Sequence, residues 1–121
     1  MKTNFLFVCD SVKNDSKLNV EGIFDSVNST NFPAIHPEMA IVVNIEVPAE
    51  EQNKSYVEAF RILLDGKVVV EDSATFNPLK ARHQFFHRIQ GLLLEKPGRY
   101  DVEISVGGKK IGETYFLANS I

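Results

Sequence analysis

The sequence predicts an all-β protein, in which about seven or eight mostly antiparallel strands form a single β-sandwich. The clearest evidence is the alternation of apolar and polar residues over residues 99–106, whose apolar members are Tyr100, Val102, Ile104 and Val106. A period of two places these side chains on one face of a strand and the polar ones on the other. Gly107-Gly108 then supplies a tight hairpin turn. Turn residues recur about every ten residues, a spacing typical of a sandwich or barrel.

Length and charge limit the class of protein. The 121 residues correspond to one domain, residues 1–121, with no internal repeat or linker. The net charge of −3 and the pI near 5.6 argue against general nucleic-acid binding, which favours a basic face. The single cysteine, Cys9, cannot form an internal disulfide, so no feature indicates an oxidising compartment.

The N-terminal apolar run covers only residues 5–9. This run is too short for the apolar region of a signal peptide, and no longer run approaches a membrane span. We therefore expect a cytoplasmic protein that has no membrane partner.

The first half of the chain predicts three strands. Residues 4–10 are apolar at nearly every position, which indicates a strand covered on both faces. Residues 11–17 form a polar turn, and residues 17–27 a second strand with a glycine, Gly22, in its interior. The third strand is expected over residues 38–47.

Two prolines precede that third strand. Pro33 and Pro37 should prevent continuous ladder pairing and hold Phe32 and His36 in extended conformations. The sequence leaves the cis or trans state of both prolines open.

The second half predicts a hairpin and then an ambiguous segment. Residues 55–64 and 67–72 alternate around Asp65-Gly66, a two-residue hairpin signal. Residues 78–90 are compatible with a strand, a loop or a short helix. We favour a loop to about Arg82 followed by a strand to Leu94.

A specific local signal follows this strand. Tyr100 comes just after the Pro97-Gly98 turn and opens a strand. This arrangement resembles the tyrosine corner of immunoglobulin-like and fibronectin-type domains, in which the hydroxyl bonds the backbone at the corner. The resemblance implies an immunoglobulin-like sandwich.

Several short segments form a recognisable set: Cys9-Asp10, Lys17-Leu18-Asn19-Val20 with Gly22 and Phe24-Asp25, Phe32-Pro33, His36-Pro37, and Pro97-Gly98-x-Tyr100. Together they resemble a family of small bacterial all-β proteins of unknown function. The resemblance implies a single β-sandwich. It carries over no activity, cofactor or site residue.

One basic segment is the densest candidate for a binding site. Its members are Lys80, Arg82, His83, His87 and Arg88. They could bind a small anion or an acidic patch on a partner, although charge runs more often solvate a surface. In a strand His83 and His87 would share a face about 13 Å apart, too far for one metal ion; in a helix they would be neighbours.

The remaining reactive side chains lack the partners that chemistry needs. His36 is a candidate base beside Asp10 or Asp25, but such a histidine more often orders a loop. Cys9 is predicted to be a small, buried, apolar residue. Asp10, Asp15 and Asp25 lack the spacing of a calcium loop. We therefore predict no catalytic residue, no metal and no cofactor.

These observations favour a non-enzymatic binding domain, whose partner is another protein or a second copy paired through an edge strand. One alternative is a small-ligand or anion-binding protein or an enzyme, using residues 80–88 together with His36. Another alternative is a structural subunit of a larger assembly.

Overall fold

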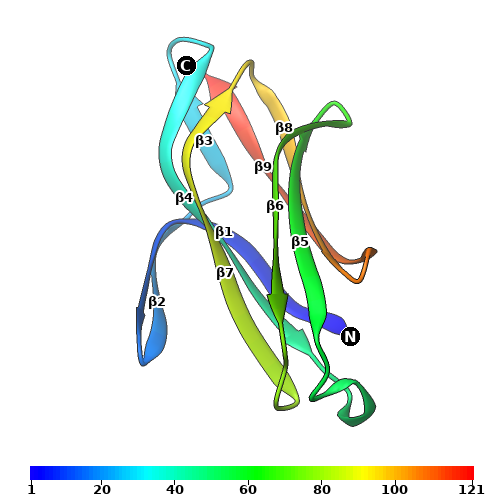
Figure 1. Cartoon of the computed structure of the whole chain (residues 1–121). Coiled ribbons are helices and arrows are strands. Elements are labelled where there is room, and N and C mark those ends of the chain that lie inside the picture. The colour runs from blue at the N-terminus through cyan, green and yellow to red at the C-terminus, as the bar shows by residue number, and fades with distance from the viewer.

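The computed structural model describes residues 1–121 as an all-β protein with two sheets and no α-helix (Figure 1). The strands are β1 (Lys2–Asp15), β2 (Lys17–Ile23), β3 (Ser26–Ser29), β4 (Ala34–Glu46), β5 (Tyr56–Leu64), β6 (Lys67–Phe76), β7 (Arg82–Leu94), β8 (Gly98–Val106) and β9 (Lys109–Ser120). A single 3-10 turn, η1 (Ala49–Glu51), joins β4 to β5. The all-β prediction is confirmed, with nine strands where about seven or eight were expected.

The sheets differ in size and shape. One has the order β2-β1-β4-β7 and the other the order β3-β9-β8-β5-β6. The apolar core lies between them and includes Ile41, Val43 and Ile45 from β4 and Ile62 from β5. Figure 1 shows β2 and part of β1 curving away from the second sheet.

Strand β8 confirms the alternation on which the fold prediction rests. Tyr100, Val102 and Ile104 are fully buried, and Val106 is nearly so. The intervening residues, such as Arg99, remain at least partly exposed. The apolar face of β8 therefore contributes to the core, as its sequence predicts.

The sheet with the order β2-β1-β4-β7 is curled (Figure 1), and this curled sheet is buried on both faces in its centre. Its outer face holds a second apolar cluster of Cys9, Val12, Ala40 and Val42. The hairpin of β1 and β2 bends over this cluster and adds Leu18 and Val20. This explains why residues 39–45 are apolar at all positions except Asn44, which is also buried.

The prediction of a polar turn over residues 11–17 is wrong. β1 continues to Asp15 and pairs with β2 up to Asp15 opposite Lys17, so the turn is Ser16 alone. Ser16 has a φ of 60°. The segment is polar because it forms the exposed end of a hairpin, and exposed strands and turns share that composition.

The single strand expected over residues 17–27 is two strands. The chain turns after Ile23, where the Phe24 N–H donates to the Val8 carbonyl at 3.2 Å. The Phe24 ring packs edge-on against Phe116 at 5.6 Å. β3 then joins the other sheet, parallel to β9. The Phe24 ring thus packs against the core at the point where the chain passes from one sheet to the other.

The prolines interrupt pairing less than expected. β4 begins at Ala34 and contains Pro37, and the ladder to β7 skips Pro37 opposite Gly91 while resuming on both sides. Gly91 has a φ of 68°, which glycine adopts without strain. The Phe32–Pro33 peptide bond is cis.

Residues 82–94 form the strand that the sequence favoured. β7 covers Arg82–Leu94, and the loop before it ends at residue 81. β6 runs to Phe76, four residues beyond the predicted end at residue 72.

No helix of the structure combines the length and apolarity that crossing a membrane requires.

Candidate functional site

Strand β7 forms one edge of the curled sheet. It has 13 residues and pairs along its length with β4 only. The pairing is uninterrupted from Arg82 opposite Glu46 to Gln90 opposite Glu38. Its other side has no strand beside it in the sheet.

The hydrogen-bond pattern identifies which backbone groups of β7 are free. The Val47 N–H donates to the Ala81 carbonyl at 2.8 Å, in line with the ladder in which Ile45 faces His83. Hydrogen-bonded pairs alternate with non-bonded pairs in an antiparallel ladder. The odd-numbered residues of β7 up to Ile89 therefore direct their backbone groups at β4. The residues that direct them outward are Arg82, Gln84, Phe86, Arg88 and Gln90.

The other sheet edges are short or interrupted. β3 has four residues and β2 seven. β6 has ten, but its pairing with β5 skips Val69 in a bulge, and the acidic residues Glu71 and Asp72 follow. Bulges, charges and short length protect natural edges from pairing with other chains. β7 is longer than these strands and has no bulge over residues 82–90, although it carries the charged residues Arg82 and Arg88.

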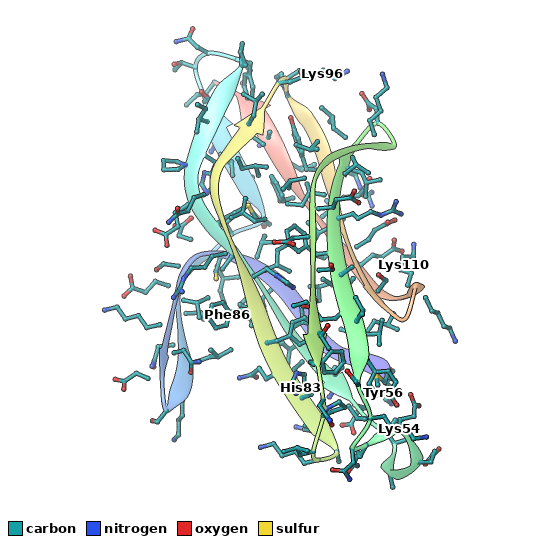
Figure 2. The ribbon with its side chains drawn as sticks, in the orientation of Figure 1. Lys54, Tyr56, His83, Phe86, Lys96 and Lys110 are labelled. Atoms are coloured by element: carbon teal, nitrogen blue, oxygen red, sulfur yellow. The ribbon has the colours of Figure 1, made fainter.

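The two histidines of the predicted basic segment point into the protein. His83 stacks on Phe76 with ring centroids 4.7 Å apart, and His87 lies at 4.7 Å from Phe60. Figure 2 shows His83 on the side of β7 that faces β5 and β6. These rings help to close the core where β7 and β6 approach each other.

The arginines of the segment point the other way. The Arg82 Nε lies 3.2 Å from a carboxylate oxygen of Glu46. Arg88 donates to the Val12 carbonyl at 2.5 Å and lies over the Phe86 ring, which Figure 2 shows on the side of β7 facing β2. Lys80 has no ion pair and borders a shallow hollow with Arg82 and Gln84. The segment is thus divided between two faces of the sheet.

His36 lies away from this segment. Its ring packs on Phe24 at 5.5 Å, and its Nε2 is 3.7 Å from Asp10. Its register partner is Leu92, which at about 3.3 Å per residue lies about 16 Å beyond His87 along β7. His36 lines none of the three main hollows of the structure.

Glu58 is the residue that sequence reasoning missed. Its carboxylate lies 2.7 Å from the His87 Nε2, and the two side chains are 4% and 13% exposed. The sequence contained one indication of its burial, because Glu58 is the single charged residue among the alternate residues of β5 that face the core. Its partner lies 29 positions away in the sequence, and no local pattern connects the two.

Burial changes the pKa of His83 and of Cys9. Desolvation lowers the pKa of His83 below its ordinary value, and Lys80 acts in the same direction while Glu58 opposes them. Burial raises the pKa of the Cys9 thiol.

No three His, Cys, Asp or Glu side chains are grouped to hold a metal ion.

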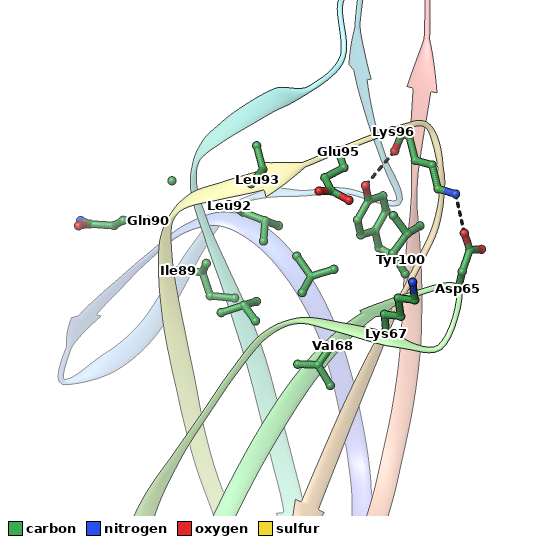
Figure 3. A pocket seen from close by; sticks show the side chains of 14 residues that line it. Asp65, Lys67, Val68, Ile89, Gln90, Leu92, Leu93, Glu95, Lys96 and Tyr100 are labelled. Carbon is green, nitrogen blue, oxygen red and sulfur yellow. Dashed lines mark hydrogen bonds and ion pairs between the residues drawn. The ribbon is translucent and has the colours of Figure 1, made fainter.

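A hollow of 530 Å³ opens where β6 and β7 diverge (Figure 3). Its walls are mainly aliphatic and come from the start of β6, the end of β7 and the base of the β5–β6 turn. The apolar lining residues are Leu64, Val68, Val69, Val70, Ile89, Leu92, Leu93 and Tyr100. The volume lies within the range of small-molecule sites.

Comparison with known proteins gives the chain a family. The model of DUF6941, a family of unknown function, matches residues 4–119. The chain belongs to this family. Membership in DUF6941 agrees with the resemblance that the short segments carry, and it assigns no activity. No match was found among curated proteins.

One solved structure is similar in fold to this DUF6941 chain. It is the Pseudomonas fluorescens alkylpurine DNA glycosylase AlkC, bound to DNA containing an abasic site analog. The TM-score is 0.59 at 14% identity, and the match covers 98% of this chain and 30% of that one. The DUF6941 chain thus spans less than a third of the glycosylase, and the likeness concerns the fold alone.

Proposed function

We propose that this protein is a non-enzymatic binding domain that holds an extended segment of another protein along the free edge of β7. The observation that carries this proposal is the row of outward backbone groups over residues 82–90, unpaired on one side and regular on the other. A segment that adds to such an edge gains main-chain hydrogen bonds, and its alternate side chains meet the two faces of the sheet.

The surroundings of β7 supply side chains for selectivity. An added strand would meet Phe86 and the polar Gln84 on the outer face of the curled sheet. β7 carries no acidic residue. The net charge of −3 supports a protein partner in preference to a nucleic acid.

A second copy of the chain is one candidate for the added segment. In an antiparallel pair, directly opposite residues carry their side chains on the same face of the sheet. The register between two copies must therefore place core-facing residues of one β7 opposite core-facing residues of the other. A register centred on Phe86 meets this condition and places Gln84 of one copy opposite Arg88 of the other. It brings no like charges together, which is compatible with a symmetric dimer.

We also propose the finer description of fold and location. The Tyr100 hydroxyl donates to the Lys96 carbonyl at 2.8 Å, a contact that supports an immunoglobulin-like tyrosine corner. The free, buried Cys9 supports a cytoplasmic location, where thiols stay reduced.

A matched pair of variants tests the binding proposal. Gln84→Pro removes an outward N–H and leaves the ladder to β4, whereas Gln84→Ala keeps that N–H. Both variants lose the 3.2 Å bond between the Gln84 and Asn44 side chains. Each protein would be used to capture partners from a native lysate, and its own mass would be measured by light scattering.

We expect a stoichiometric partner or a dimer with wild type and Gln84→Ala, and its loss with Gln84→Pro. A monomer that captures no stoichiometric partner would contradict the proposal. Equal capture by both variants would contradict the assignment to the β7 edge.

A further inference from the structure

We propose that the segment held along β7 is acidic and places a carboxylate side chain next to Gln84. This inference rests on the proposed function, because it names the chemistry of the segment that adds to the β7 edge. A row of side-chain hydrogen bonds carries it, since that row crosses the curled sheet and ends at Gln84 with an unused donor.

Three amide side chains form this row on the outer face of the curled sheet. Asn4 of β1 donates to the side-chain oxygen of Asn44 at 2.8 Å, and Asn44 of β4 donates to the side-chain oxygen of Gln84 at 3.2 Å. Asn44 is only 8% exposed, so its amide depends on both partners. The row thus spans three neighbouring strands and reaches the free edge at β7.

A carboxylate sets the direction of the row. The Asn4 Nδ2 also lies 3.3 Å from Glu46, whose ionised side chain can only accept hydrogen bonds. Because Asn4 presents its amino group, Asn44 turns its oxygen to Asn4 and its own amino group to Gln84. Gln84 therefore uses its oxygen within the row, and its Nε2 has no partner in the chain. The edge presents a donor, which an acceptor on an added strand would satisfy.

Cations lie on both sides of this unused donor. Gln84 lines two shallow hollows, one beside Lys80 and Arg82 and the other beside the tip of the β1–β2 hairpin, where Lys17 lies. Neither hollow is lined by an acidic residue. Lys17 and Lys80 have no ion pair. The surroundings of Gln84 therefore favour a negatively charged acceptor.

The acidic residues that the sheet register places here leave Lys80 uncompensated. Glu46 lies opposite Arg82 and accepts from its Nε at 3.2 Å, so these two charges balance. Asp15 lies opposite Lys17 in the hairpin register, without an ion pair between them. Even if Asp15 offsets the charge of Lys17, Lys80 remains available beside Gln84.

A second copy of the chain would not supply the acceptor. β7 contains no aspartate or glutamate, and a symmetric register centred on Phe86 sets the Gln84 donor opposite Arg88, which is also a donor. A carboxylate from another protein would accept from the Gln84 Nε2 and interact favourably with Lys80. The half-buried ring of Phe86, two residues along, suits an apolar side chain. The partner segment that fits is extended, with an acidic residue opposite Gln84 and an apolar residue opposite Phe86.

Three seven-residue peptides test the charge at constant length. The first is acetyl-Thr-Val-Thr-Glu-Thr-Glu-Thr-amide, in which antiparallel pairing can place Val opposite Phe86 and the first Glu opposite Gln84. The second peptide has Gln and the third has Lys in place of both Glu residues. Each peptide is titrated into the full chain and followed by amide NMR signals. We expect saturable shifts along residues 82–88, with the Glu peptide binding about tenfold more tightly than the Gln peptide and the Lys peptide binding weakest.

A matched pair of lysine variants tests the cation. Lys80→Gln removes an exposed charge that belongs to no ion pair. It should weaken binding of the Glu peptide about threefold and leave binding of the Gln peptide unchanged. Lys109→Gln, at the start of β9 in the other sheet, is the control and should change neither affinity.

The variant Gln84→Glu tests the donor. It keeps a side-chain oxygen for Asn44 and replaces the outward amino group with a carboxylate oxygen. We expect the order of the peptides to invert, so that the Lys peptide binds more tightly than the Glu peptide. This gain of binding cannot come from a loss of folding.

Equal affinities of the Glu and Gln peptides, an unchanged order in Gln84→Glu, an unaltered Glu-peptide affinity in Lys80→Gln, or the absence of saturable binding would each overturn this inference. The proposed function is judged separately by the capture experiment. A stoichiometric partner that is lost with Gln84→Pro would support the β7 edge even if the peptides showed no preference for charge.

Discussion

Glu58 and His87 form a buried contact that joins the two sheets. The Glu58 Oε2 lies 2.7 Å from the His87 Nε2, with β5 in one sheet and β7 in the other. The Phe60 and Phe85 rings surround His87 at 4.7 and 6.0 Å. Because water is largely excluded, each side chain depends on the other to satisfy its polar group.

Removing one member of this pair should be costly, and removing both should not. His87→Phe leaves the Glu58 carboxylate buried without its partner, so we expect a loss of about 3 kcal/mol in the free energy of unfolding. The double variant Glu58→Leu/His87→Phe should recover most of that loss. Urea unfolding of the wild type, both single variants and the double variant measures the coupling. Additive losses would show that the contact does not stabilise the fold.

The pKa of His83 predicts a pH-dependent stability. Burial lowers this pKa in the folded state below the ordinary value of 6.5. The folded state therefore binds fewer protons than the unfolded state as the pH falls through about 6.5, and stability must decrease with it. We expect the free energy of unfolding to fall between about pH 7 and about pH 5, with a shallower slope in His83→Phe. Equal slopes in the two proteins would exclude this contribution of His83.

The Tyr100 hydroxyl should contribute about one hydrogen bond of stability. Tyr100→Phe keeps the ring that stacks on Phe116 and removes the hydroxyl that donates to the Lys96 carbonyl. We expect a loss of about 1 kcal/mol in the free energy of unfolding. Tyr115→Phe is the control, because Tyr115 is 47% exposed and packs under the Arg99 guanidinium. A similar effect of both variants would show that the hydrogen bond of Tyr100 adds no more stability than an exposed tyrosine hydroxyl does.

The two faces of β8 should respond oppositely to the same charged residue. Val102→Asp places an unpaired carboxylate in the core, at a cost comparable with the total stability of a domain, so the protein should unfold. Ser105→Asp lies opposite Lys110 in the register and should leave the free energy of unfolding within about 0.5 kcal/mol. Far-UV circular dichroism and thermal melting compare them, and a folded Val102→Asp would contradict the burial of this face.

The strands that sequence reasoning placed well are those with one buried face. β8 alternates cleanly, so the buried positions of Tyr100 and Val102 follow from the period of two. Strands buried on both faces, such as β4, lose that alternation. Val42 lies between the core residues Ile41 and Val43 on the opposite face of β4, and it is nevertheless buried in the second cluster.

The errors arose where long-range contacts decide the conformation. Phe24 ends β2 because it packs on Phe116, far along the chain, and no local pattern near Phe24 shows this. The same limit applies to Glu58, whose inward parity was visible but whose partner was not. The basic segment was seen correctly as a cluster in sequence. Only the strand geometry shows that His83 and Arg82 occupy opposite faces.

Amide hydrogen exchange along β7 tests the proposed binding edge most directly. In the free monomer, the amides of His83, Phe85 and His87 should be protected by β4, and those of Gln84, Phe86 and Arg88 should exchange rapidly. When the partner segment or a second copy is bound, the even-numbered amides should become protected as well. Continued rapid exchange of Gln84, Phe86 and Arg88 in the bound state would contradict the account.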